Sequence, residues 1–244
     1  MKKIFAFMAM AATILAVSCN KPAANNSGNG GGNNSTKYEA PITIDGNFDD
    51  WAKLDATKVQ EMKCPAGHPK PDIKLAKVYA DKYYVFVYLE MDYTAYDGEV
   101  NMAHIDFCLD GDANTSTGGY TGQWLQGETP CIDVLIEGSI IEDGEVCDYD
   151  PFVGIWGGEV NADGWTWTEV EGLTGFIEGK GDKKVWEFKI TRELYPDGKI
   201  AKEFNMGIIS TVNGWDATGA LPNTTPTEEN ANGQAPLLKV NFNN

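Results

Sequence analysis

The sequence has few of the side chains on which most catalytic mechanisms depend. It contains two histidines, His68 and His104. It lacks a nucleophile elbow, a zinc-binding His-Glu-x-x-His helix and a phosphate-binding glycine loop. Cys64 and His68 lie close together in sequence but form an incomplete ligand set for a soft metal. We therefore expect a protein that is not an enzyme, although a glycosidase needs only two carboxylates, and 36 acidic residues supply many.

Positive charge is also scarce. The chain has 19 Lys and Arg against 36 Asp and Glu, which gives a net charge of −17. Such a surface repels phosphate backbones and anionic lipid headgroups, so nucleic acid is not an expected partner. Carboxylates in excess can bind hard cations, but most of them form a solvated surface.

Long apolar runs are absent except at the N-terminus. Lys2 and Lys3 precede an uncharged apolar run over residues 4–17, and small residues then lead to Cys19. This is the pattern of a secretory signal peptide, and the run is short for a membrane-spanning helix. A cysteine directly after the small residues resembles the lipobox of bacterial lipoproteins. We expect cleavage before Cys19 and acylation of that cysteine; an ordinary signal peptide is the alternative.

The segment after the cysteine indicates a tether. Residues 20–36 are dominated by Gly, Asn and Ser and contain no large apolar side chain, so they cannot bury enough surface to fold. We therefore divide the chain into a signal peptide (1–18), a lipidated tether (19–37) and a single domain (38–244). Asn20 fits sorting to the outer membrane. The acidic export tag of surface lipoproteins in Bacteroides-like bacteria is absent from residues 20–24. We expect an outer-membrane lipoprotein whose domain is either periplasmic or surface-facing.

The alternation of apolar residues is mostly that of β-strands. It is clearest over residues 83–91, 104–109, 131–136, 185–190, 206–212 and 237–242. Short runs of this kind between Gly, Asn and Asp turns predict an all-β fold. We expect a jelly-roll-like β-sandwich of two antiparallel sheets with about ten strands. Residues 191–195 predict the one helical turn, which Pro196 ends.

Four cysteines follow Cys19, which allows up to two disulfides in an oxidising compartment. Cys108 and Cys131 lie in neighbouring strand-like runs and alternate with apolar residues. We predict a disulfide between them; the alternative is that some cysteines remain small buried thiols.

Several segments, in order, resemble one family. Residues 42–51 (ITIDGNFDDW) resemble the opening of family 9 carbohydrate-binding modules, which belong to the DOMON-like β-sandwiches. Residues 78–87 resemble their second hairpin, 106–118 their acidic loop and 185–190 a late strand. The resemblance implies a β-sandwich that binds carbohydrate. The two tryptophans that enclose a sugar in such modules do not align here, so that function does not transfer residue by residue.

The acidic loop of residues 110–118 (DGDANTSTG) is the best local candidate for a metal site. Oxygen-bearing side chains at alternate positions of a turn converge on one point, which suits calcium. The alternative is an inter-strand turn in which Asp and Asn bond their own backbone. The loop lacks the glycine and glutamate that an EF-hand requires. The candidate calcium ligands are Asp110, Asp112, Asn114, Thr117 and Asp106.

Tryptophans in loop-like contexts are candidates for carbohydrate binding. An exposed indole offers a flat apolar plane for the C–H face of a sugar, with polar neighbours for its hydroxyls. The candidate ligand-binding residues are Trp215, Trp124, Asn213, Asp216 and Tyr120. Another set of tryptophans is expected in the core or on a sheet face: Trp51, Trp165, Trp167 and Trp186.

These observations predict a lipid-anchored, non-catalytic module of the bacterial envelope that binds an oligo- or polysaccharide. The membrane contact is expected through the lipid anchor only. An alternative is a structural or adhesive envelope domain that binds protein partners. A glycoside hydrolase is the third hypothesis.

Overall fold

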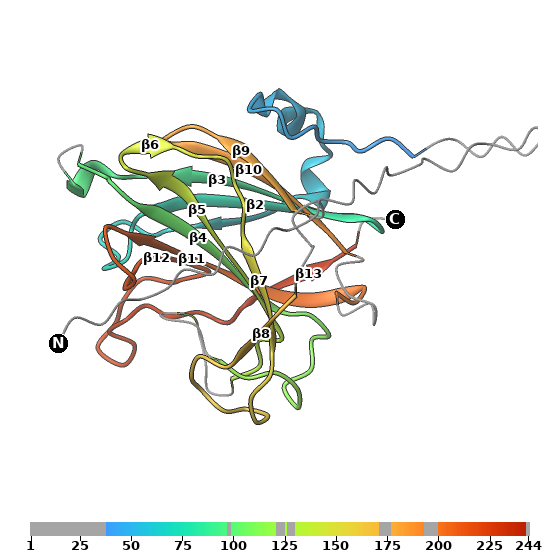
Figure 1. Ribbon diagram of the computed structural model, residues 1–244, viewed down its shortest axis with the longest axis vertical. Coiled ribbons are helices and arrows are strands. Elements are labelled where there is room, and N and C mark those ends of the chain that lie inside the picture. Colours follow the sequence, from blue (N-terminus) through green and yellow to red (C-terminus); the bar gives the residue numbers. More distant parts are fainter. Residues whose placement is uncertain are drawn as a thin grey trace, which may run out of the picture. The chain divides into compact units, whose positions relative to one another are not determined.

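The chain folds into two antiparallel β-sheets (Figure 1). The computed structural model describes residues 38–96, 99–120, 125, 130–170, 177–192 and 200–242. The smaller sheet has five strands in the order β1 (Gln60–Lys63), β2 (Ile73–Ala80), β3 (Tyr84–Met91), β10 (Val185–Thr191) and β9 (Ile177–Gly181). Together with the larger sheet, it confirms the predicted all-β, two-sheet antiparallel sandwich.

The larger sheet has eight strands. Its main path runs β12 (Ala217–Leu221), β11 (Glu203–Val212), β4 (Ala103–Asp110), β5 (Val134–Glu142), β7 (Phe152–Trp156) and β8 (Trp167–Glu169). Two further strands lie off this path, β13 (Leu238–Asn241) beside β11 and β6 (Glu145–Val146) beside β5. The described residues thus hold 13 strands where about ten were predicted. Short strands such as β6 and β8 have too few residues to show an alternating pattern.

The core lies between the two sheets. The longer strands contribute alternate side chains to it, because successive side chains of a strand point to opposite faces. Phe107 of β4 and Phe188 of β10 meet across the two sheets, with ring centroids 5.1 Å apart and ring planes at 74°. Tyr149 contacts Phe188 from another side at 4.9 Å. These rings are almost fully buried.

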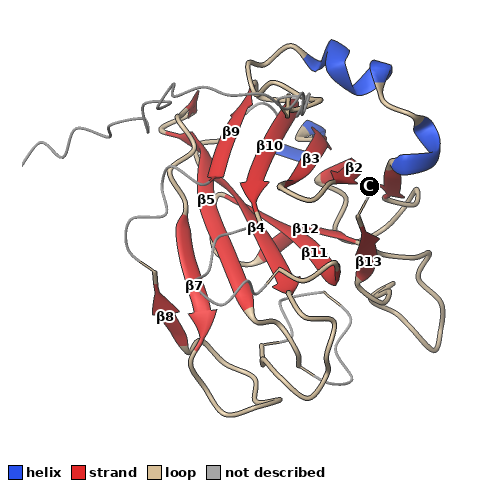
Figure 2. Ribbon diagram, turned by 90° about the vertical axis from the view of Figure 1, so that its right-hand side faces the viewer, coloured by secondary structure: helices blue, strands red, loops and turns tan. Residues whose placement is uncertain are grey.

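The outer face of the smaller sheet is covered by the segment that precedes β1. Ile42 and Trp51 of this segment pack against Phe86 of β3. The buried Glu187 of β10 accepts hydrogen bonds from the backbone N–H groups of Asp45 (3.0 Å) and Gly46 (2.8 Å). The segment of residues 42–51 therefore covers one face of the sandwich, and Figure 2 shows its helical part beside β2 and β3.

The helices in the described part of the chain are short 3₁₀ segments. They are η1 (Phe48–Lys53), η2 (Ala56–Lys58) and η3 (Thr94–Tyr96). Asn47 caps η1 by accepting a hydrogen bond from the N–H of Asp49. Within the described residues, no helix has the length and apolar character needed to cross a bilayer. The helical turn predicted at residues 191–195 falls mostly outside the described residues.

The predicted disulfide between Cys108 and Cys131 is wrong, because both side chains are free thiols in the structure. The strand register explains why. Cys108 pairs with Leu135, four residues beyond Cys131. Cys131 precedes the start of β5 at Val134, and four extended residues span about 13 Å, whereas a disulfide needs Cα atoms within about 7 Å. Cys108 lies instead in an apolar cluster with Leu125 and Leu135.

Candidate functional site

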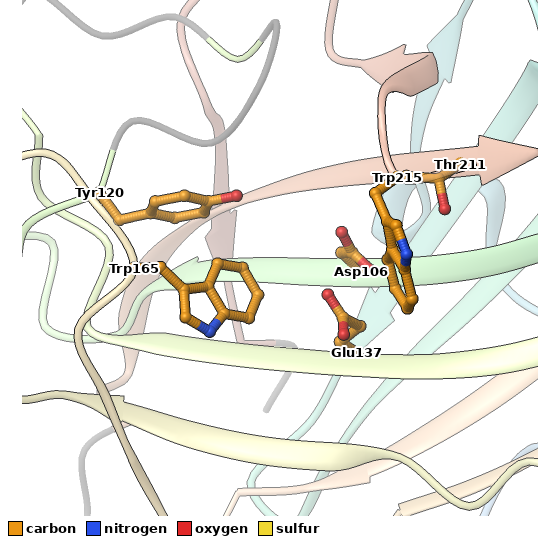
Figure 3. A pocket seen from close by; sticks show the side chains of 6 residues that line it. All are labelled: Asp106, Tyr120, Glu137, Trp165, Thr211 and Trp215. Carbon is orange, nitrogen blue, oxygen red and sulfur yellow. The ribbon is translucent and has the colours of Figure 1, made fainter.

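A pocket lies on the outer face of the larger sheet. The residues of β4 that alternate with its core residues point to this face, and Asp106 is among them. On the neighbouring strand β5, Glu137 is the direct register partner of Asp106. The pocket has a volume of about 350 Å³. We call it the aromatic pocket, and its lining residues are Asp106, Tyr120, Glu137, Trp165, Thr211 and Trp215 (Figure 3).

The two tryptophans stand on opposite sides of the aromatic pocket. Figure 3 shows Trp165 and Tyr120 on one side, Trp215 on the other, and the two carboxylates between them. Trp215 is 62 % exposed and Trp165 is 59 % exposed, which is unusual for such large apolar side chains. The arrangement offers two flat apolar surfaces above a polar floor.

Trp215 lies in the connection between β11 and β12. Its indole stacks on the ring of His104, with centroids 4.7 Å apart and planes at 24°. His104 is itself buried and lies 3.4 Å from the Thr211 hydroxyl through Nδ1. Burial lowers the pKa of His104, so the imidazole supports the indole in its neutral form.

Asn213 holds the turn that carries Trp215. Its backbone has a φ of 52°, a left-handed conformation that asparagine tolerates. Its Oδ1 accepts hydrogen bonds from the N–H groups of Asn101 (2.8 Å) and Met102 (3.2 Å), and its Nδ2 donates to the Glu99 carbonyl (2.7 Å). Through these hydrogen bonds, the Asn213 side chain fixes the turn that positions Trp215. Of the predicted ligand-binding residues, Asn213 therefore has a positioning role, and the exposed Asp216 is outside the pocket lining.

The opposite wall is an aromatic cluster. Tyr120 makes edge contacts with Trp165 at 5.9 Å and with Trp167 at 5.4 Å. The backbone N–H of Tyr120 donates to the Ala162 carbonyl at 2.8 Å, which joins the loop after β4 to the loop before β8. Two loops far apart in sequence thus build one wall.

Two carboxylates form the floor. Asp106 is only 6 % exposed, and its Oδ1 has no hydrogen-bond partner among the described residues. Burial raises the pKa of Asp106 well above its ordinary range, and the nearby Glu137 charge raises it further. Burial also raises the pKa of Glu137. Both groups are therefore more easily protonated than carboxylates in water.

The acidic loop forms a second, separate cluster. Carboxylate oxygens of Asp110, Asp112 and Asp133 lie within 4.8 Å of one another. Three converging carboxylates suit a hard cation such as calcium. Asp106 is not part of this cluster, because it lies four strand positions before Asp110, roughly 13 Å along β4.

Asn114 and Thr117 brace this cluster. The Asn114 N–H donates to carboxylates of Asp110 (3.1 Å) and Asp112 (3.0 Å), and the Thr117 hydroxyl donates to Asp112 (3.0 Å). These are the bonds of an Asx turn, as the alternative interpretation of the loop expected. Burial raises the pKa of Asp110, and the Asp112 carboxylate adds to the effect. A cation bound there would offset this repulsion.

Sequence reasoning identified part of the aromatic pocket and missed the rest. Trp215 is exposed as predicted, and Tyr120 lines the pocket. Trp51 and Trp186 are buried as predicted, whereas Trp165, expected in the core or on a sheet face, is exposed. Trp124 and Cys19 lie outside the described residues.

Four site residues were missed: Glu137, Trp165, Thr211 and Asp133. Glu137 had a recognisable signal, because it is the one charged residue in the apolar run of residues 134–141. Asp133 had none, because only the register brings it beside Asp110: its N–H donates to the Leu109 carbonyl and its Oδ2 accepts from the Gly111 N–H.

Comparison of the chain with models of known protein families finds no match, and comparison with curated protein sequences finds none either. Any function for this protein is therefore argued from the geometry of the aromatic pocket and the acidic loop.

Proposed function

We propose that the domain binds an oligo- or polysaccharide in the aromatic pocket without transforming it. The supporting observation is the pair of exposed indoles, Trp165 and Trp215, that stand on opposite sides of a polar floor. Sugar rings have apolar C–H faces and polar edges, so they suit a site with aromatic walls and hydrogen-bonding groups between them. The volume of about 350 Å³ falls in the range of small-ligand sites, roughly 300–1,000 Å³.

The domain is proposed to work at the cell envelope. The apolar run before Cys19 and the polar tether after it support a lipid anchor on the outer membrane. Several acyl chains on one cysteine bind a bilayer firmly, since each buried methylene contributes about 0.8 kcal/mol. Calcium at Asp110, Asp112 and Asp133 is proposed as a structural ion of the loop beside the pocket.

The test is a glycan-array screen of residues 38–244, followed by calorimetric titration with the glycans found. Trp215→Ala and Trp165→Ala should each weaken binding about tenfold or more, since a fully covered large side chain contributes roughly 1.5–3 kcal/mol. Tyr83→Ala is the matched control, because Tyr83 is an exposed aromatic residue between β2 and β3 and is not part of the pocket. Each variant must keep the wild-type melting transition.

Unchanged affinity in both folded tryptophan variants would place the glycan site elsewhere. If the wild-type domain binds no glycan, the adhesive-domain hypothesis with a protein partner replaces this proposal.

Glycoside hydrolysis is a second candidate, favoured by the Asp106–Glu137 pair. Opposite residues on antiparallel strands have Cβ atoms about 4.5–5.5 Å apart, and retaining glycosidases place two carboxyl groups about 5–5.5 Å apart. Such enzymes need one carboxyl protonated and the other ionised, with pKa values driven apart. Here burial raises the pKa of both groups, and no Lys or Arg of the described lining holds either of them ionised, which favours binding over catalysis. If the wild-type domain releases reducing ends from the glycans that it binds, and Glu137→Gln abolishes this activity, hydrolysis would become the preferred function over binding alone.

A further inference from the structure

The floor of the aromatic pocket holds two carboxyl groups without a matching cation. None of the described residues that line it is Lys or Arg. Neither Asp106 nor Glu137 forms a salt bridge within the described part of the chain. Asp106 is 94 % buried and yet leaves Oδ1 without a hydrogen-bond donor. Buried polar groups are almost always paired, so a floor of two carboxyl groups with incomplete pairing favours a ligand that brings positive charge or hydrogen-bond donors to Asp106 and Glu137.

The residues around these two carboxyl groups indicate which ligand suits the pocket. An indole face attracts a cation through its quadrupole, and a carboxylate attracts it through charge. Trp215 and Trp165 provide indole rings on opposite sides of the pocket, and Asp106 and Glu137 provide the carboxyl groups between them. We propose that the aromatic pocket recognises a protonated amine, so that its preferred glycan contains an amino sugar with a free amino group. This inference rests on the proposed function of the pocket as a glycan site.

Other ligands fit these residues less well. A neutral sugar hydroxyl can donate to Asp106, but it brings no charge to offset the pair. A bare hard cation prefers six or more oxygen ligands, and two tryptophan faces supply none. A uronic acid or a sulfated sugar would place an anion beside two carboxylates on a chain of net charge −17.

The decisive experiment compares three oligosaccharides that differ at one substituent. They are β-1,4-linked oligomers of glucosamine, N-acetylglucosamine and glucose, of equal length, titrated into residues 38–244 by calorimetry. The pH is chosen so that the free amine is protonated. The glucosamine oligomer should bind about tenfold or more tightly than the other two, which corresponds to one charge-assisted hydrogen bond.

Two isosteric variants test whether the preference for the amine comes from Asp106 and Glu137. In Asp106→Asn and in Glu137→Gln, affinity for the glucosamine oligomer should fall about tenfold or more, toward that of the glucose oligomer. Asp150→Asn is the matched control, because Asp150 is exposed and its loss removes one negative charge away from the pocket. If Asp106→Asn does not fold, Glu137→Gln alone carries the test, since Glu137 is only half-buried.

The outcomes separate the two proposals. Equal affinity for all three oligomers would overturn the amine inference and leave the pocket as a glycan site. An amine preference that persists in both variants would also overturn it, since the cation would then bind elsewhere. Absence of binding to these oligomers and to every glycan on the array would overturn the proposed function and the amine inference together.

Discussion

Replacing Asp106 by asparagine tests whether the pocket floor lowers the stability of the fold. Asp106 and Glu137 face each other on adjacent strands, where opposite Cβ atoms lie about 4.5–5.5 Å apart. Two like charges about 5 Å apart repel by roughly 3 kcal/mol at an effective dielectric constant of about 20. Protonation of one carboxyl relieves part of this repulsion, so Asp106→Asn should stabilise the domain at neutral pH by about 1–3 kcal/mol. The melting temperature should rise by roughly 2–12 °C.

The sign of the pH dependence follows from the raised pKa of Asp106. Below its unfolded pKa of about 3.9, both the folded and the unfolded chain hold the proton, and the wild type keeps its full stability. As the pH rises, the unfolded chain loses the proton first, because burial and Glu137 raise the pKa of Asp106 in the folded chain. The wild type therefore loses stability until the pH passes the folded pKa. Asparagine does not titrate, so the advantage of the variant should appear only above about pH 4 and increase toward neutral pH.

The measurement is urea unfolding of wild type, Asp106→Asn and Asp150→Asn between about pH 4 and pH 8. Asp150→Asn controls for the loss of one charge from an acidic chain, and it should show a much smaller change because Asp150 is exposed. Equal or lower stability of Asp106→Asn at neutral pH would refute the reasoning. It would mean that the Asp106 carboxylate is already well solvated or well paired.

Three further predictions concern the anchor, the loop and the thiols. Expressed whole in a diderm host, the protein should partition with membranes, and Cys19→Ala should release it or leave it unprocessed; an unmodified Cys19 at the mature terminus, found by intact mass, would contradict the anchor. Calcium should raise the melting temperature of the domain. At a calcium concentration one hundred times Kd, the free energy of unfolding should increase by about 2.7 kcal/mol, and Asp110→Ala with Asp112→Ala should remove the effect. If elemental analysis finds no calcium and a chelator leaves the melting curve unchanged, the acidic loop is an inter-strand turn and not a calcium site. Peptide mapping without reduction should find no peptide linking Cys108 to Cys131, because the register holds them apart.

The strands were predictable because their signal is local. Residues 83–91 and 185–190 alternate apolar and polar or aromatic side chains, and they correspond to β3 (Tyr84–Met91) and β10 (Val185–Thr191). A period of two reports directly that successive side chains face opposite sides. The same pattern does not say what covers each face. The segment around Trp51 covers the smaller sheet through contacts with Phe86 and Glu187, which lie far away in sequence.

The site was only partly predictable because it depends on register. Asp106 and Glu137 lie 31 residues apart and become neighbours only when β4 pairs with β5 in this alignment. A shift by one residue would turn either side chain into the core. The register of β4 and β5 cannot be deduced from the sequence, and for this reason the predicted disulfide between Cys108 and Cys131 was wrong. Trp215 was recognised because its context, between Asn-Gly and Asp in a turn, is itself local.

The acidic loop and the aromatic pocket share β4 but are held by different contacts. Asp106 and Asp110 point to the same face of that strand, and the chain after Asp110 leads to Tyr120 in the pocket wall. The far end of this loop is fixed without any ion. Gly118 has a φ of 67° and lies so close to the backbone of residues 131–132 that a Cβ would meet it at 2.7 Å.

The neighbouring backbone bonds continue this attachment. Gly119 exchanges hydrogen bonds with Ile132, at 3.1 and 2.6 Å, and the N–H of Tyr120 donates to Ala162 at 2.8 Å. Tyr120 is therefore positioned by its own backbone bonds, whereas an ion would order the part of the loop near Asp112. Removing calcium should accordingly lower the melting temperature while leaving the affinity for a bound glycan within about twofold, less than the cost of one hydrogen bond. If a chelator titration lowers the melting temperature and the glycan affinity in parallel, the acidic loop and the pocket wall are coupled.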